Sequence, residues 1–154
     1  MLEFSRSSDP VLSGFDMGHI SVAGSMQTIT TKDKSPSQEC MIFLAVSELL
    51  DGLRDFLSGQ KREFHFIATD SSFQLVFEID RNSGEVSISS ANSLVHQENL
   101  SELISAVESA ASLLVRNWAT EQPDARWETE QPDTPMRDLQ FSLQKWKEEI
   151  VGRC

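Results

Sequence analysis

Cysteines, basic residues and long apolar runs are all scarce in this chain, and each scarcity excludes a class of protein. Two cysteines, Cys40 and Cys154, are too few for a secreted disulfide framework, so we expect both to be reduced thiols. No run approaches the roughly 20 apolar residues that cross a bilayer. The first residues also lack the basic start and the apolar stretch of a secretory signal. The sequence therefore predicts a cytoplasmic protein.

Basic side chains are outnumbered, with 13 Lys and Arg against 24 Asp and Glu and a formal net charge of −11. A polyanion needs Lys and Arg to replace its counterions, so this charge disfavours nucleic acid and anionic membranes as partners. A basic protein is the natural partner of such a surface. Solubility is the alternative explanation, because many cytoplasmic proteins are acidic.

Apolar residues are nevertheless abundant, at 39% of the 154 residues, and they include nine Phe and three Trp. A chain of this size and composition folds and buries a core without metal or disulfide staples. We predict a single α+β domain, with an antiparallel sheet of four or five strands, two main helices on one face, and a C-terminal helix after a Pro-containing spacer. The predicted parts are an α+β domain over 1–118, an acidic spacer over 119–133, and a helix over 134–154 that packs on the same domain or on a second protomer.

The first helix is predicted from a cap followed by apolar residues at three- and four-residue steps. Ser35 is the expected N-cap, with Gln38 at the capping-box spacing, and the helix should run over about 36–58. Gly59 is expected to take the left-handed conformation that ends many helices. Gly52, inside the helix, indicates the close approach of another backbone.

Two further helices are predicted in the second half of the chain. Asn99 caps one of them, with Glu102 three residues on, and Thr134 opens the other. Their apolar stripes are Leu100, Leu103, Ile104, Val107, Ala111, Leu114, Val115 and Trp118 in the first, and Met136, Leu139, Leu143, Trp146 and Ile150 in the second.

A hairpin and a meander are predicted from alternating apolar residues. The alternation from Phe15 to Thr30 changes phase at Gly18, which indicates a bulge or bend there, and Gly24 with Ser25 is a candidate turn. The segments REFHFIATD, SFQLVFEID and EVSIS then indicate three strands. One face of the second segment is wholly apolar and the other mostly polar, as expected of an antiparallel sheet covered on one side.

No motif in the sequence specifies a chemical reaction. Cys40, His65 and Asp70 are the only candidates for a nucleophile, a base and an orienting carboxylate, and their spacing says nothing about proximity. The three histidines lack the spacing of a zinc site, and the seven glycines are scattered rather than gathered in a phosphate loop. We therefore predict no catalytic residue, no metal and no cofactor, with a small hydrolase of unknown substrate as an alternative.

The motif TEQPD occurs twice, at 120–124 and 129–133, with Trp127 between the copies. One short duplication does not make a solenoid, so this stretch is predicted to be a spacer. Trp127 either holds the spacer to the domain or, with the C-terminal helix, contacts a partner or a second copy, since Trp is frequent among interface hot spots. A homodimer, or an accessory protein that assembles through that helix, is therefore an alternative function.

The segments FDMGHISVAG, PSQECMIFLAVSELLDGL and DSSFQLVFEI resemble small uncharacterised bacterial proteins with the same hairpin, helix and meander over residues 15–90. The size and acidity of the chain are also similar to those of immunity proteins, which bind and neutralise bacterial toxins. This resemblance implies a non-enzymatic protein-binding module whose acidic face covers a basic toxin surface. The candidate contacts are Glu78, Asp80 and Glu85 on the meander, and Glu121, Asp124, Trp127, Glu128, Glu130 and Asp133 along the spacer.

Overall fold

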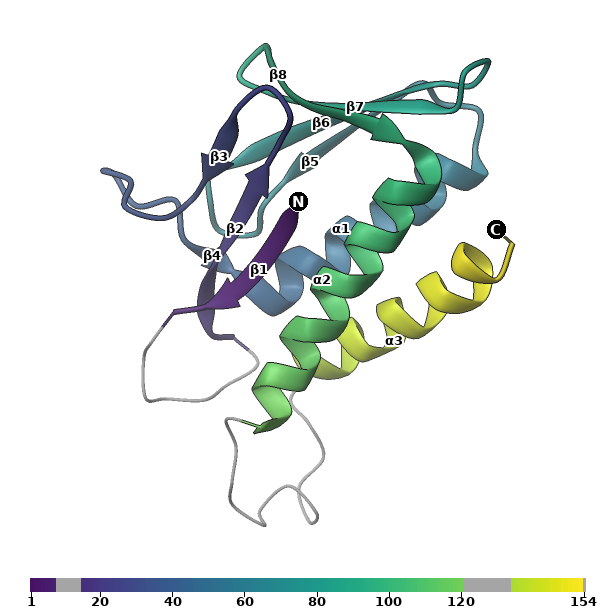
Figure 1. Ribbon diagram of the computed structural model, residues 1–154. Helices are drawn as coiled ribbons and strands as arrows, with labels where there is room; N and C mark the ends of the chain where they lie inside the picture. The colour runs from purple at the N-terminus through teal and green to yellow at the C-terminus, as the bar shows by residue number, and fades with distance from the viewer. Residues whose placement is uncertain (8–14, 121–133, 154) are drawn as a thin grey trace.

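The computed structural model describes residues 1–7, 15–120 and 134–153 (Figure 1). Over these residues it is an α+β fold with three α-helices and two antiparallel sheets, which confirms the predicted fold class. The first sheet contains β1 (Leu2–Arg6), β2 (Met17–Ala23), β3 (Thr28–Thr30) and β4 (Cys40–Met41). The second is the meander β5 (Glu63–Ile67), β6 (Gln74–Asp80), β7 (Glu85–Ser90) and β8 (Ser93–Asn99). The helices are α1 (Ile42–Ser58), α2 (Leu100–Thr120) and α3 (Thr134–Glu149), followed by a 3-10 turn, Val151–Arg153.

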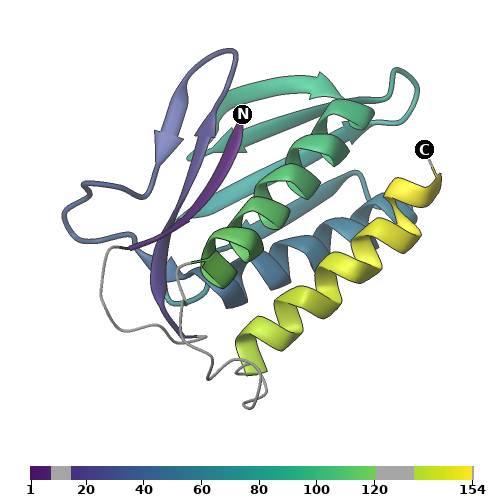
Figure 2. The same cartoon turned by 60° about the horizontal axis from the view of Figure 1, so that its bottom comes forward.

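Helices α1 and α2 cover one face of the second sheet, and the other face is open to solvent (Figures 1 and 2). Strand β6 shows the reason, because Leu75 and Phe77 are buried while the alternating Glu78 and Asp80 are exposed. Alternation of this kind places one face of an antiparallel sheet on the core and the other in water. Within the described residues, no helix is long and apolar enough to cross a membrane.

Helix α3 packs against α1 and also contacts α2 (Figure 2). The hydroxyls of Ser47 on α1 and Ser142 on α3 share a buried hydrogen bond of 2.8 Å, and Arg54 Nε lies 3.4 Å from Glu149 Oε2. The apolar side of α3 is therefore occupied by its own chain. The predicted stripe is buried at all five positions, Met136, Leu139, Leu143, Trp146 and Ile150.

The start and end of α1 differ from the prediction. The helix begins at Ile42, preceded by Met41 with no side-chain cap, and Ser35 is not its N-cap. The reason is that Cys40 and Met41 pair with β2, so the first sheet takes residues that the capping-box pattern assigned to the helix. Gly59 has a φ of −95°, which is extended rather than left-handed.

Two glycine predictions also need correction. Gly52 is approached by an aromatic ring and not by a backbone, since a Cβ there would lie 2.2 Å from Phe64 Cζ. The predicted bulge at Gly18 is wrong, because β2 pairs with β1 in continuous register. Gly18 is instead a point of close contact, where a Cβ would lie 2.3 Å from the carbonyl oxygen of Ser5.

Two local predictions are confirmed, and three strands were missed. β2 and β3 form the predicted antiparallel hairpin, and Asn99 Oδ1 accepts the N–H of Glu102 at 3.0 Å as the cap of α2. β1 and β4 were not predicted, and both pair with β2, so the hairpin belongs to a sheet separate from the meander rather than to the single sheet predicted. β8 was missed as well, and it is the strand of the second sheet that the β2–β3 turn contacts.

The turn between β2 and β3 docks on β8. The N–H groups of Met26 and Gln27 donate to the carbonyl of Val95 at 3.1 and 3.4 Å, and the N–H of Ser25 donates to His96 Nδ1 at 2.9 Å. Gly24 makes this approach possible, because a Cβ there would lie 2.0 Å from the same Val95 oxygen. This contact covers the β8 edge of the second sheet from Leu94 to His96.

Candidate protein-binding surface

A polar hollow of about 760 Å³ lies largely on the solvent face of the second sheet, opposite α1 and α2. It is lined by all three residues predicted on the meander, Glu78, Asp80 and Glu85, and by a fourth carboxylate, Glu63. We call this surface the acidic hollow. Glu63 was missed from the sequence, although in REFHFIATD it shares the outward phase of His65.

The strand register places like charges directly opposite one another in the acidic hollow. Glu63 on β5 is the partner of Glu78 on β6, and Asp80 on β6 is the partner of Glu85 on β7. Like charges at directly opposed positions destabilise an antiparallel pair, whereas opposite charges there stabilise it. The sheet thus carries two adjacent pairs of carboxylates in which neither member has a basic residue directly opposite it in the register.

Two of these carboxyls are held in the ionised form by hydrogen bonds. The N–H of Asn82 donates to the Asp80 carboxylate, and the hydroxyl and N–H of Ser83 donate to it as well. These hydrogen bonds, that of Asn82 above all, hold the pKa of Asp80 below its usual value. A hydrogen bond from His65 likewise lowers the pKa of Glu63. Both groups therefore stay negative at neutral pH and below.

The cations near the hollow do not balance these charges. Arg81 donates to the main-chain carbonyls of Phe56 at 3.3 Å and Lys61 at 2.9 Å, so it fastens the β6–β7 turn to the last turns of α1 and to the segment after it. Arg62 lies near Asp80, where its charge favours the carboxylate. With four carboxylates against two guanidinium groups, one of them bound to backbone, the hollow is suited to cationic side chains of another molecule.

The remaining predicted contacts, in the spacer, lie outside the described residues. They are Glu121, Asp124, Trp127, Glu128, Glu130 and Asp133.

Of the residues proposed for a hydrolase, Cys40 lies in a segment that is bound to the turn holding Asp70, since the N–H of Met41 donates to the carbonyl of Thr69 at 3.1 Å and the Ser71 hydroxyl donates to the carbonyl of Gln38 at 2.7 Å. Cys40 is fully buried, its Sγ is 3.8 Å from the carbonyl oxygen of Gly18, and burial, reinforced by the charge of Glu39, raises the thiol pKa to about 12. His65 pairs with Glu63 on the solvent face of the second sheet. A buried thiol with a raised pKa is not a nucleophile.

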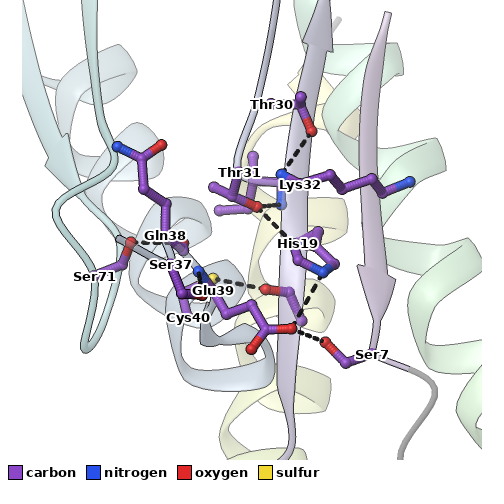
Figure 3. A network of polar contacts seen from close by, with 12 residues as sticks. Ser7, His19, Thr30, Thr31, Lys32, Ser37, Gln38, Glu39, Cys40 and Ser71 are labelled. Atoms are coloured by element: carbon purple, nitrogen blue, oxygen red, sulfur yellow. Dashed lines mark hydrogen bonds and ion pairs between the residues drawn. The ribbon is translucent and has the colours of Figure 1, made fainter. Parts of the chain in front are cut away.

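Figure 3 shows a chain of polar contacts at the base of the first sheet that superficially resembles a catalytic triad. His19 Nε2 is 3.3 Å from Glu39 Oε1, and His19 Nδ1 is 3.0 Å from Thr31 Oγ1. The Thr31 hydroxyl also accepts the N–H of Ile20 at 3.1 Å, and the residue is only 1% exposed, so no substrate reaches it. Because Ser7 Oγ also donates to Glu39 at 2.7 Å, the network fastens together the end of β1, strand β2 and the connection between β3 and β4. Its role is structural.

No group of three or more His, Cys, Asp or Glu in the described parts of the chain is arranged to hold a metal ion. No family model, curated protein or solved structure matches the chain.

Proposed function

We propose that this chain is a non-enzymatic protein-binding module that recognises a basic partner through the acidic hollow, in the manner of an immunity protein that neutralises a basic bacterial toxin. The observation that supports the proposal is the pair of like-charge contacts, Glu63 with Glu78 and Asp80 with Glu85, on a solvent-exposed sheet face. Lys or Arg side chains of a partner would supply the missing opposite charges.

The net charge of −11 favours the same kind of partner over a longer range. Attraction between a negative and a positive surface speeds encounter and weakens as salt screens it, with a screening length of about 10 Å at 0.1 M. Binding driven by the hollow should therefore be faster and tighter at low salt.

The test is capture of partners from the native host by the tagged protein at low salt, with release at high salt followed by mass spectrometry. The same experiment is run with the double variant Glu78→Gln/Glu85→Gln. The matched control is Glu102→Gln/Glu148→Gln, which makes the same change in net charge at exposed positions on α2 and α3. We expect one stoichiometric basic protein that is lost with the first variant and kept with the control.

Capture that is unaffected by salt and by both double variants would contradict the proposal. Equal loss with both variants would show that net charge, rather than the hollow, governs binding.

Self-assembly through α3 is the second candidate, and one observation favours it. Phe141 on the outer side of α3 is 61% exposed, with Lys145 Nζ 5.5 Å from the centre of its ring. The buried stripe of α3 is already occupied by α1, so an assembly would have to use this outer side. Mass measured over a concentration series, for the wild type and Phe141→Ser, tests it. A constant monomer mass removes this candidate.

A further inference from the structure

Strand β5 forms the second edge of the meander, and its outer hydrogen-bonding groups point away from the sheet. On the β6 side, the carbonyl of Arg62 accepts the N–H of Ile79 at 3.0 Å, and the N–H of Ala68 donates to Phe73 at 3.0 Å. Bonded positions alternate along an antiparallel ladder, so Phe64 bonds β6 as well. The N–H and C=O groups of the intervening residues therefore face outward, namely those of Glu63, His65 and Ile67.

This edge is open between two fixed points. At its far end, the carbonyl of Thr69 accepts the N–H of Met41 at 3.1 Å, so β4 limits the edge there. At its near end, the carbonyl of Lys61 is bound by Arg81. Between them, within the part of the chain that the structure describes, no hydrogen bond reaches the outward main-chain groups of β5.

The open edge also lacks several of the features that usually prevent strand addition. Proteins protect sheet edges with proline, lysine, bulges or a covering segment. Strand β5 reads EFHFI, pairs with β6 in continuous register, and exposes Ile67 by 56%. It is therefore a template for one more strand.

The side chains along β5 specify the chemistry of that strand. On the solvent face, Glu63 extends the acidic hollow to the edge, so a cationic side chain fits beside it. On the opposite face, the half-buried ring of Phe64 lies between Phe56 and Phe77, with ring centres at 6.2 and 5.9 Å. An apolar side chain fits beside this aromatic row. The matching strand alternates cationic and apolar residues.

We propose that β5 binds an extended segment of the basic partner as a fifth strand of the meander, with cationic side chains over the acidic hollow and apolar side chains beside Phe64. This inference rests on the proposed function and names how the same surface engages its partner. A second copy of this chain is a poorer occupant, because pairing two copies through β5 brings two acidic hollows, each on a chain of net charge −11, side by side.

The first test uses a synthetic probe with the full-length protein. The probe is a capped seven-residue peptide that alternates lysine and valine, made in three forms: unmodified, N-methylated on the lysine amides, and N-methylated on the valine amides. Alternate amides of an added strand face the sheet, so one methylated form should bind at least tenfold more weakly and the other within threefold of the unmodified peptide. Loss with the lysine form indicates antiparallel addition, and loss with the valine form indicates parallel addition.

The second test alters the protein. His65→Pro removes an outward N–H that β6 does not use, and proline is tolerated at such edge positions. We expect it to weaken binding of the unmodified peptide at least tenfold, with His65→Ala within threefold of the wild type. Thermal unfolding monitored by circular dichroism checks that the proline variant is folded. If it is not, the pair of methylated peptides decides.

Equal binding of the two methylated peptides, loss of both, or no binding of the unmodified peptide would overturn strand addition. A wild type that dimerises while His65→Pro stays monomeric would also overturn it, because a second copy would then be the occupant. These outcomes are distinct from failure of the proposed function, which shows as partner capture insensitive to salt and to Glu78→Gln/Glu85→Gln. The two methylated peptides could bind equally while partner capture still depends on salt and on Glu78→Gln/Glu85→Gln. That result would mean that the partner is bound through side chains alone.

Discussion

The two edges of the meander, β5 and β8, carry the same residue pair and yet have opposite surroundings. On β5, Glu63 pairs with His65, and on β8, His96 pairs with Glu98, two residues apart in both cases. The side chain of His65 is 62% exposed on the solvent face, whereas that of His96 is 18% exposed, since it lies on the inward face opposite buried Ile88 and accepts the Ser25 N–H of the β2–β3 turn. The comparison shows that a similar residue pair does not fix whether an edge is open, which depends on the face that the pair occupies and on what packs against the edge.

The largest effect is expected from opening the closed edge with Gly24→Ala. The added Cβ would meet the backbone of Val95, which cannot move aside as a flexible side chain can. We expect a loss of about 2–4 kcal/mol in the free energy of unfolding, measured by urea denaturation. The control is Gly152→Ala, whose Cβ would lie 3.4 Å from the Lys147 oxygen and should cost little. A Gly24→Ala variant as stable as the wild type would show that the turn is not docked on β8.

The two edge histidines provide a direct comparison of equal substitutions. His96→Ala removes the acceptor of the Ser25 N–H and should lower the free energy of unfolding by about 1–1.5 kcal/mol. His65→Ala, at the open edge, should change it by less than about 0.5 kcal/mol. Thermal or urea unfolding of both variants measures the difference. Equal effects would contradict the contrast between a closed and an open edge.

Alkaline pH tests the burial of the Cys40 thiol on β4, the strand that limits the open edge at its far end. The pKa of the Cys40 thiol is raised from 9.0 to about 12, so its stabilising contribution is complete below pH 9 and is lost as the pH rises from 9 towards 12. The stability advantage of the wild type over Cys40→Ala should therefore narrow by about 1 kcal/mol between pH 8 and pH 10. Urea denaturation at both pH values measures this. A constant advantage would indicate that water reaches the thiol.

The smallest effect is expected beside the open edge, from Glu78→Gln. Removing one charge of the Glu63–Glu78 pair relieves repulsion between opposed positions, so the melting temperature should rise by about 1 °C. Glu102→Gln, at the start of α2, should not raise it, because a carboxylate there is favoured by the helix dipole. A lower melting temperature for Glu78→Gln would mean that the four carboxylates do not repel one another.

Periodic patterns explain which parts of the fold could be predicted. The period-two alternation of β6 and the stripe of α3 each repeat over enough residues to identify the element and its buried face. Strand β8 could not be found in this way, because a bulge lies between its pairings with Ile88 and Ser89. Its inward residues after the bulge are His96 and Glu98, which are polar and pair with each other, so the apolar alternation does not continue along the strand.

The candidate surface was predictable only in part, for a related reason. The outward phase of β6 identifies Glu78 and Asp80, but it does not show which residues lie opposite them. That depends on register, which pairs residues 15 apart in the case of Glu63 and Glu78. The open edge of β5 depends on the order of strands in space, which alternation in a single strand does not encode.

The docking of the β2–β3 turn on β8 also bears on the order in which the protein folds. The contact joins residues about 70 positions apart, as between Ser25 and His96, whereas the meander is built from neighbouring strands. Contacts between distant residues carry a greater loop-closure entropy, and they tend to form after local ones. We therefore expect the meander to form first and the first sheet to join it after the rate-limiting step. Gly24→Ala should then speed unfolding while leaving the folding rate nearly unchanged.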